Sequence, residues 1–152
     1  MTTENAKKLA ILLLGFAGGY LETDTRLQKI AFIVEEEVFK DWAKFEPNDY
    51  GPYSKELAKA LKELEKEGKI IHVIDEVGLS KYYLTDDGRK QFNELLKSIN
   101  PNDIAKAEEI VERHKDDALS YLIAYVYAKY PQYAVKSKII DKVYEWRRYY
   151  GI

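Results

Sequence analysis

The stretch that decides the fold is residues 50–88, which read YGPYSKELAKALKELEKEGKIIHVIDEVGLSKYYLTDDG. Residues 50–53 predict a turn, because Gly and Pro interrupt regular structure. The next segment, 54–66, predicts a helix that opens with a capping serine and is followed by a terminating glycine. Short apolar runs at 70–71 and 82–84 then predict two strands joined by a tight connection.

The order of these elements is typical of a winged helix-turn-helix, in which a helix is followed by a two-stranded wing. Residues 85–88 open one more helix directly after the second strand. The predicted fold class is therefore mainly α with a small β-hairpin wing. It consists of a winged helix-turn-helix core plus additional C-terminal helices.

Two helices are predicted upstream of this stretch. The first begins at Thr3 and ends at the pair Gly18-Gly19, since glycines commonly terminate helices. The second begins near Thr23 to Thr25, and residues Thr25–Gln28 fit a capping box, in which each side chain reaches the backbone N–H of the other residue. Residues 45–53 carry turn chemistry, so we expect a loop between this helix and the deciding stretch.

Three further helices are predicted at 101–114, 116–130 and 137–149. We therefore divide the chain into a winged helix-turn-helix core at 1–99 and a helical extension at 100–152, within the same compact domain. The middle helix of the extension is apolar nearly all round, which predicts either a central core helix or half of a subunit interface. We expect a homodimer, and the candidate interface residues are Leu119, Leu122, Tyr125, Val126, Ile139, Val143 and Trp146.

The helix at 54–66 is the candidate recognition helix. At about 100° per residue its leucines share one face, and four lysines share the opposite face. Such a stripe suits a phosphate backbone, whereas Arg, Asn or Gln, which read bases best, do not occur in the helix. We expect weak, salt-sensitive and modestly specific binding of double-stranded DNA. The candidate contact residues are Asn48, Tyr50, Tyr53, Ser54, Lys55, Lys59, Lys62, Lys66 and Lys81.

A second interpretation of this helix needs no ligand. Lys and Glu are good helix formers, and pairs such as Lys59–Glu63 and Glu63–Lys66 support a solvated helix by a few tenths of a kcal/mol each. The wing is equally open to two interpretations, because Lys81 favours phosphate contact while Asp75 and Glu76 oppose it. It serves either as a DNA contact or as a structural hairpin.

Composition narrows the classes of function that the chain can have. The chain has 24 Lys and Arg against 26 Asp and Glu, so any basic surface must be local. It has no cysteine and two histidines, which excludes disulfides and Cys-based zinc sites and argues against a His-rich metal site. We expect no enzyme activity, no metal and no cofactor. The apolar runs are too short to span a bilayer and no signal peptide is evident, so we expect a cytoplasmic protein.

Three groups of residues resemble the Panacea domain of SocA-type antitoxins and phage-associated proteins. They are Tyr50–Ser54 with Leu57, Leu61, Gly68 and Ile70; Arg26–Lys29 with Phe32-Ile33; and Tyr127, Tyr130-Pro131 and Ser137. The resemblance implies a winged helix with extra C-terminal helices, and it carries no catalytic residues. The Panacea group includes antitoxins and adaptors as well as suspected DNA binders. We therefore expect a DNA-binding transcriptional regulator, and the alternative is a protein-interaction module such as an antitoxin or adaptor.

Overall fold

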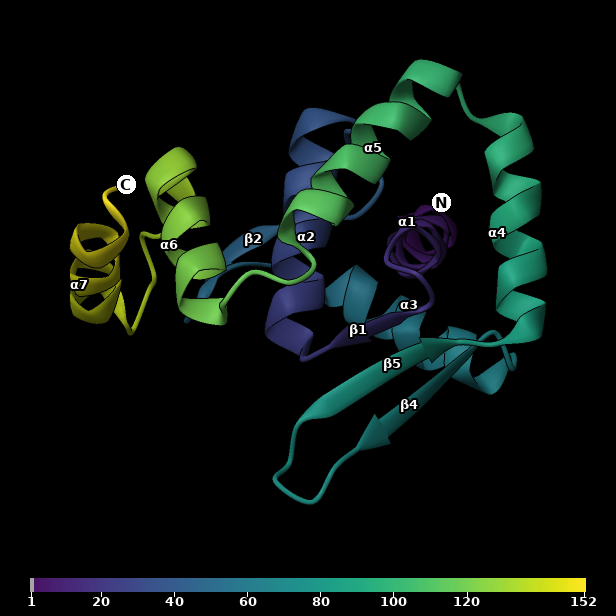
Figure 1. Ribbon diagram of the computed structural model, residues 1–152, viewed down its shortest axis with the longest axis horizontal. Helices are drawn as coiled ribbons and strands as arrows, with labels where there is room; N and C mark the ends of the chain where they lie inside the picture. Colours follow the sequence, from purple (N-terminus) through teal and green to yellow (C-terminus); the bar gives the residue numbers. More distant parts are fainter. Residues whose placement is uncertain (1) are drawn as a thin grey trace.

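The computed structural model describes residues 2–152 and confirms the predicted fold class (Figure 1). It is mainly helical with a small three-stranded sheet and a separate two-stranded hairpin. The elements in chain order are α1 Thr2–Phe16, β1 Tyr20–Glu22, α2 Asp24–Glu37, β2 Glu46–Asn48, β3 Gly51–Tyr53, α3 Lys55–Lys66, β4 Ile70–Ile74, β5 Ser80–Leu84, α4 Asp86–Ser98, α5 Pro101–His114, α6 Leu119–Lys129, the short 3-10 helix η1 Pro131–Tyr133, and α7 Ile140–Tyr150.

Helix α1 forms the centre of the core. Figure 1 shows it end-on, surrounded by α2, α3, α4 and α5, and every residue from Leu9 to Leu14 is buried. A helix that is apolar all round needs neighbours on all sides, and α1 has them. Gly15 lets α4 approach closely, since a β-carbon placed there would lie 2.1 Å from the Phe92 ring. Phe92 in turn packs edge-on against Phe16 at 5.3 Å between ring centroids.

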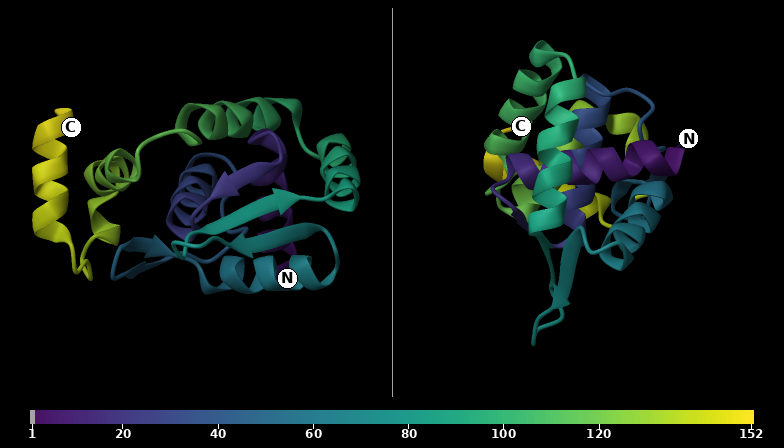
Figure 2. Two further views of the ribbon diagram at one scale, coloured as in Figure 1. Left: turned by 60° about the horizontal axis from the view of Figure 1, so that its bottom comes forward. Right: turned by 90° about the vertical axis from the view of Figure 1, so that its right-hand side faces the viewer.

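The wing is a three-stranded antiparallel sheet in the order β1-β5-β4. Strand β1 is an element that the sequence did not predict, and it pairs Tyr20 with Tyr83 and Leu21 with Tyr82. Leu21 is buried, so β1 also ties the sheet to the core. The β4–β5 hairpin projects well beyond the helices, as the right-hand view of Figure 2 shows. Its tip lies at Gly78, whose φ is 87°.

Residues 45–53, predicted as a loop, instead contain the antiparallel hairpin β2–β3. Its register places Pro47 opposite Pro52 and Asn48 opposite Gly51. Gly51 has a φ of 95°, a conformation that other residues rarely adopt, and a β-carbon there would lie 2.7 Å from the Tyr127 ring. Sequence patterns did not predict this hairpin, because its strands are short and contain prolines, which are uncommon within strands.

Helix α2 begins within the predicted range, whereas its predicted capping box and the predicted start of α6 are wrong. Thr23, rather than Thr25, caps α2, because the Thr23 hydroxyl accepts a hydrogen bond from the Arg26 N–H at 3.1 Å. The predicted capping box is therefore absent from residues 23–28, and the Gln28 side chain is free for another role. Helix α6 begins at Leu119 rather than at residue 116. Asp117 lies before that helix, and its carboxylate contacts Nδ1 of the buried His114 at 2.6 Å.

The C-terminal helices continue outward from α2. Helix α5 packs on α1 and α2, α6 packs on α2, and α7 packs mainly on α6 (Figure 1). Ile123, Ala124, Tyr127 and Val143 form a small second core between α6 and α7. No helix within residues 2–152 is long and apolar enough to cross a membrane.

The burial of three candidate residues removes them from the predicted dimer interface. Leu122, Val126 and Val143 are completely buried within the single chain, so a second copy cannot reach them without opening the helices. The all-round apolar pattern of α6 reflects its position between α2 and α7. The remaining candidates are partly exposed, and they are Leu119, Tyr125, Ile139 and Trp146.

Candidate nucleic-acid interface

Helix α3 presents the predicted lysine stripe to solvent. It buries Leu57, Ala60, Leu61 and Leu64, and it packs mainly against α1. Because the buried residues occupy one face, the opposite face must point outward. The side chains of the stripe are all exposed, and they are Lys55, Lys59, Lys62 and Lys66.

Lys7 of α1 pairs with two acidic residues at the end of α3. Nζ of Lys7 lies 2.7 Å from the Glu67 carboxylate and 3.7 Å from that of Glu63. The hydrogen bond to Glu67 raises the pKa of Lys7. Glu63 is therefore turned toward α1 instead of pairing with lysines of its own helix. Among residues 2–152, no carboxylate forms an ion pair with any of the four lysines of the stripe.

The residues around the N-terminus of α3 differ in their availability. Ser54 is completely buried, and its hydroxyl accepts a hydrogen bond from the Leu57 N–H at 3.0 Å. Its predicted contact with DNA is therefore wrong, because the side chain is committed to capping the helix. Asn48 and Tyr50 are exposed at the turn of the β2–β3 hairpin, and Tyr53 is half-buried.

The residue groups Arg26–Lys29 and Tyr50–Ser54 contact each other at the N-terminus of α3. The Gln28 side chain accepts a hydrogen bond from the Ser54 N–H at 2.9 Å and donates one to the Ser54 carbonyl at 3.0 Å. The neighbouring Lys29 ammonium donates to the Pro52 carbonyl at 3.1 Å. Both polar side chains are buried. We call these contacts the α2–α3 clasp, and they hold the start of α3 against α2.

A cavity of about 210 Å³ separates α3 from the wing. Lys62 and Glu65 of α3 line one side, and Asp24, His72 and Tyr82 contribute to the rest. The Tyr82 hydroxyl donates to the Asp24 carboxylate, while the Tyr82 ring stacks on His72 at 4.4 Å. Burial and this carboxylate raise the pKa of Tyr82 well above its ordinary value. With two carboxylates in it, this cavity opposes phosphate, which leaves phosphate contact to the exposed rim.

The wing offers little basic surface. Lys81 lies 3.7 Å from Asp75, so its charge is partly compensated. Asp75 organises the tip, because its side chain accepts hydrogen bonds from the N–H groups of Val77 and Leu79. The Leu79 hydrogen bond is the main cause that lowers the pKa of Asp75. At Lys81, these contacts favour a structural hairpin over a DNA contact as the role of the wing.

One face of the wing sheet carries four exposed apolar side chains beside Glu22 and Lys81. We define the wing face as Tyr20, Ile71, Val73 and Tyr83, which the strand register places on the same side. Their exposed fractions run from 36% for Tyr20 to 52% for Ile71. The Tyr20 and Tyr83 rings lie 4.9 Å apart across the strands. Contiguous exposed apolar surface is characteristic of binding sites.

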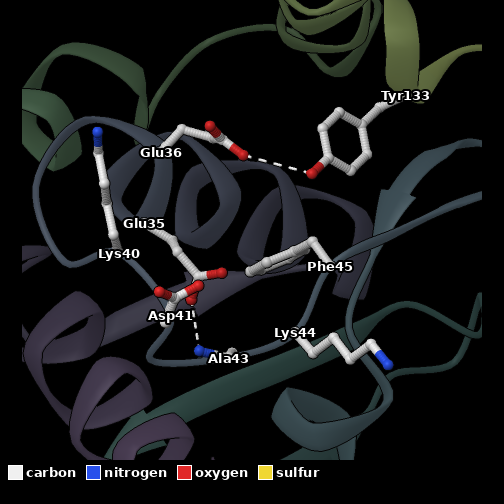
Figure 3. Close-up of a pocket in the computed structure, with 8 residues that line it drawn as sticks. All are labelled: Glu35, Glu36, Lys40, Asp41, Ala43, Lys44, Phe45 and Tyr133. Atoms are coloured by element: carbon white, nitrogen blue, oxygen red, sulfur yellow. Dashed lines mark hydrogen bonds between the residues drawn. The ribbon is translucent and has the colours of Figure 1, made fainter.

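A further cavity, of about 520 Å³, lies away from α3, between the end of α2 and η1 (Figure 3). Its walls include Glu35, Glu36, Asp41 and Tyr133. Glu35 is buried and accepts a hydrogen bond from the Ala43 N–H. Burial raises the pKa of Glu35 to about 7, with smaller contributions from the nearby carboxylates of Glu36 and Asp41 and against the opposing effect of the Ala43 hydrogen bond. We interpret Glu35 as the anchor of the segment after α2.

The sequence analysis placed the lysine stripe correctly but missed Gln28, Lys29, His72 and Tyr82. One signal was available for the first two. Helix α2 has apolar residues on nearly every side from Leu27 to Val34, so polar residues among them must be buried. The partners of His72 and Tyr82 depend on tertiary packing that no local pattern reveals.

Comparisons with known proteins add no family to this geometry. A scan of the chain against protein-family models and a search of curated proteins each found no match. The resemblance to the Panacea group stays a prediction, and the site must be interpreted from its own residues.

Proposed function

We propose that the protein is a cytoplasmic, homodimeric winged-helix DNA-binding protein that acts in transcriptional control. The observation that supports this most directly is the lysine stripe of α3. Its four lysine side chains are exposed and form no ion pair with a carboxylate in the described chain, while Lys7 engages Glu63 and Glu67. A helix in this state is suited to lie along a phosphate backbone.

The residue types determine the kind of binding. Lysine neutralises phosphate but discriminates poorly between bases, so sequence preference falls to the exposed Asn48 and Tyr50 beside the helix. The four phosphate contacts of one protomer give a salt slope of about −3.6 in log affinity against log salt, counted for each protomer that binds. The affinity of one protomer is then expected to fall roughly 150-fold between 50 and 200 mM salt.

A triple variant tests this proposal. Replacing Lys55, Lys59 and Lys62 by Gln removes three phosphate contacts, so the slope should shrink to about −0.9. The matched control replaces the exposed Lys106, Lys136 and Lys142 by Gln, which removes equal charge elsewhere. Electrophoretic retardation across a salt series gives the slopes. If the unmodified protein retards no duplex at low salt, or if both variants change the slope equally, the proposal fails.

Dimerisation has its own support and test. The exposed aromatic residues Tyr144 and Tyr149 flank the solvent-facing side of α7, about 140° apart around the helix axis, and Trp146 is partly exposed. We propose that this outer surface of α7 pairs two copies. Tyr149→Ser with Tyr144→Ser should convert the dimer to a monomer in sedimentation equilibrium. A wild-type protein that sediments as a monomer at all concentrations rules out the dimer.

The wing face favours a second candidate function, that of a protein-interaction module such as an antitoxin or adaptor. Phosphate does not bind apolar surface, whereas protein partners do. Ile71→Ser with Tyr83→Ser should then abolish capture of a defined partner, while the lysine variant retains it. Loss of duplex binding in the lysine variant, with no effect of the wing-face variant on any partner, favours the DNA-binding proposal instead.

A further inference from the structure

Within residues 2–152, the outer edge of strand β4 has no backbone partner. Strand β4 is the last strand of the wing sheet, and on its inner side it pairs with β5. At its two ends the Thr85 N–H donates to the Lys69 carbonyl, and the Asp75 N–H donates to the Leu79 carbonyl. Because hydrogen-bonded pairs alternate along an antiparallel ladder, every second residue between these ends directs its backbone groups away from β5. These residues are Ile70, His72 and Ile74.

The edge lacks the features that commonly protect an exposed strand. Such edges carry lysine, proline or a bulge, which discourage pairing with another chain. Residues 70–74 read IIHVI, without a charge or a proline, and they pair with β5 in continuous register. Ile71, Val73 and Ile74 are exposed. The hairpin extends beyond the helices in the right-hand view of Figure 2, so a second chain can approach this edge.

The charges at the two ends of β4 indicate which chain fits the edge. Lys69 precedes the neutral strand, and Asp75 and Glu76 follow it. Asp75 lies 3.7 Å from Lys81, whereas Glu76 is exposed. When two β4 strands pair antiparallel, the Lys69 end of each copy meets the acidic end of the other, while a parallel pair brings like charges together. The strand is therefore complementary in charge to a second copy of itself.

The outward-facing residues also define a register. With a two-fold axis at His72, the outward-facing backbone groups of one copy meet those of the other, because His72 lies opposite His72 and Ile70 opposite Ile74. Ile71 then lies opposite Val73 of the second copy, on the wing face. The His72 side chain leaves the edge open, since its Nε2 contacts the Ser80 hydroxyl at 2.9 Å within its own sheet.

We propose that β4 is a self-association edge, at which two copies of the chain pair as antiparallel strands around His72 and join their wing sheets into one. This edge is separate from the lysine stripe of α3 and from the outer surface of α7. The proposal therefore goes beyond DNA binding and α7 pairing and depends on neither. Strands of this length bury little surface, so the association is weak and needs a higher protein concentration than a stable dimer. Where α7 also pairs, the edge links dimers into larger assemblies.

Amide hydrogen exchange tests the pairing residue by residue. The full chain is followed by NMR at about 50 μM and about 1 mM, the range in which a weak association becomes populated. The His72 and Ile74 amides face outward in the single chain and should exchange several-fold more slowly at the higher concentration. The Ile71 and Val73 amides, which face β5, should exchange more slowly than these at the lower concentration. Exchange at His72 and Ile74 that does not depend on concentration overturns the proposal.

Two double variants test the register. Ile71→Glu with Val73→Glu places like charges opposite each other across the pair, whereas Ile71→Lys with Val73→Glu places opposite charges there. Both variants remove the same exposed apolar side chains, and both place a carboxylate opposite Lys81 of their own chain. Circular dichroism checks that both fold.

Sedimentation equilibrium at about 1 mM measures their association, in a parent chain that carries Tyr144→Ser and Tyr149→Ser so that α7 does not contribute. The parent and the Lys–Glu variant should form dimers, and the variant with two glutamates should be a monomer. A monomeric parent chain, dimers in both variants, or monomers in both overturns the proposal. None of these outcomes alters duplex binding by α3, which the lysine variant tests.

Discussion

Replacing Glu35 by Gln should stabilise the protein at alkaline pH and leave it nearly unchanged at acid pH. Glu35 is 9% exposed, and its pKa is raised from 4.5 to about 7, mainly by burial. Because the folded chain holds this proton more tightly than the unfolded chain, stability is lost as the pH rises from about 4.5 to about 7. The difference in pKa corresponds to about 3 kcal/mol at pH 8 and about 0.4 kcal/mol at pH 4.5.

Glutamine has nearly the same shape and still accepts the hydrogen bond from the Ala43 N–H. The assay is urea unfolding, followed by circular dichroism at pH 4.5 and pH 8, for wild type and variant. Glu108→Gln, at an exposed position of α5, controls for the loss of one carboxylate. If Glu35→Gln changes the free energy of unfolding by the same amount at both pH values, burial of Glu35 does not have the consequence argued above.

Three further changes have defined outcomes. Gly15→Ala should destabilise the fold by about 1–3 kcal/mol in urea unfolding, because its β-carbon meets the Phe92 ring; Phe92→Leu in the same chain should recover part of the loss. Gln28→Leu should cost about 2–5 kcal/mol, because it leaves the buried N–H and carbonyl of Ser54 unpaired. The pKa of Lys29 is lowered from 10.5 to about 8, so the unfolded chain binds this proton more tightly than the folded chain does. The free energy of unfolding therefore rises with pH across that window by up to about 3 kcal/mol, and Lys29→Met should lack this rise.

Each of these expectations has a contrary result. An additive double variant of Gly15 and Phe92 shows that the two residues do not clash. A Gln28→Leu protein as stable as wild type shows that water replaces the clasp. Equal slopes of stability against pH for wild type and Lys29→Met show that the Lys29 ammonium is not buried in solution.

Local chemistry accounts for the elements that the sequence predicted well. Helix α3 has a capping serine, an apolar face and a terminal glycine within one short stretch, and the structure reproduces all three. Strand β1 could not be found in this way, since its three residues become a strand only by pairing with β5, some sixty residues later in the chain. The same holds for the cap of α2, where Thr23 and Thr25 are equally plausible until the backbone path is known.

The residues of the candidate site also differ in whether the local sequence could predict their exposure. Exposure of Lys55, Lys59 and Lys62 follows from helical geometry once the leucines are buried. The burial of Ser54 depends on Gln28, and the pairing of Glu63 depends on Lys7, which belongs to another helix. Contacts between residues distant in sequence therefore decide which of the predicted side chains remain available.

The α2–α3 clasp has a consequence for motion. Gln28 and Lys29 are consecutive residues of α2, and they hold Ser54 and Pro52 directly before α3. Because both side chains are buried, a displacement of α2 carries the start of α3 with it.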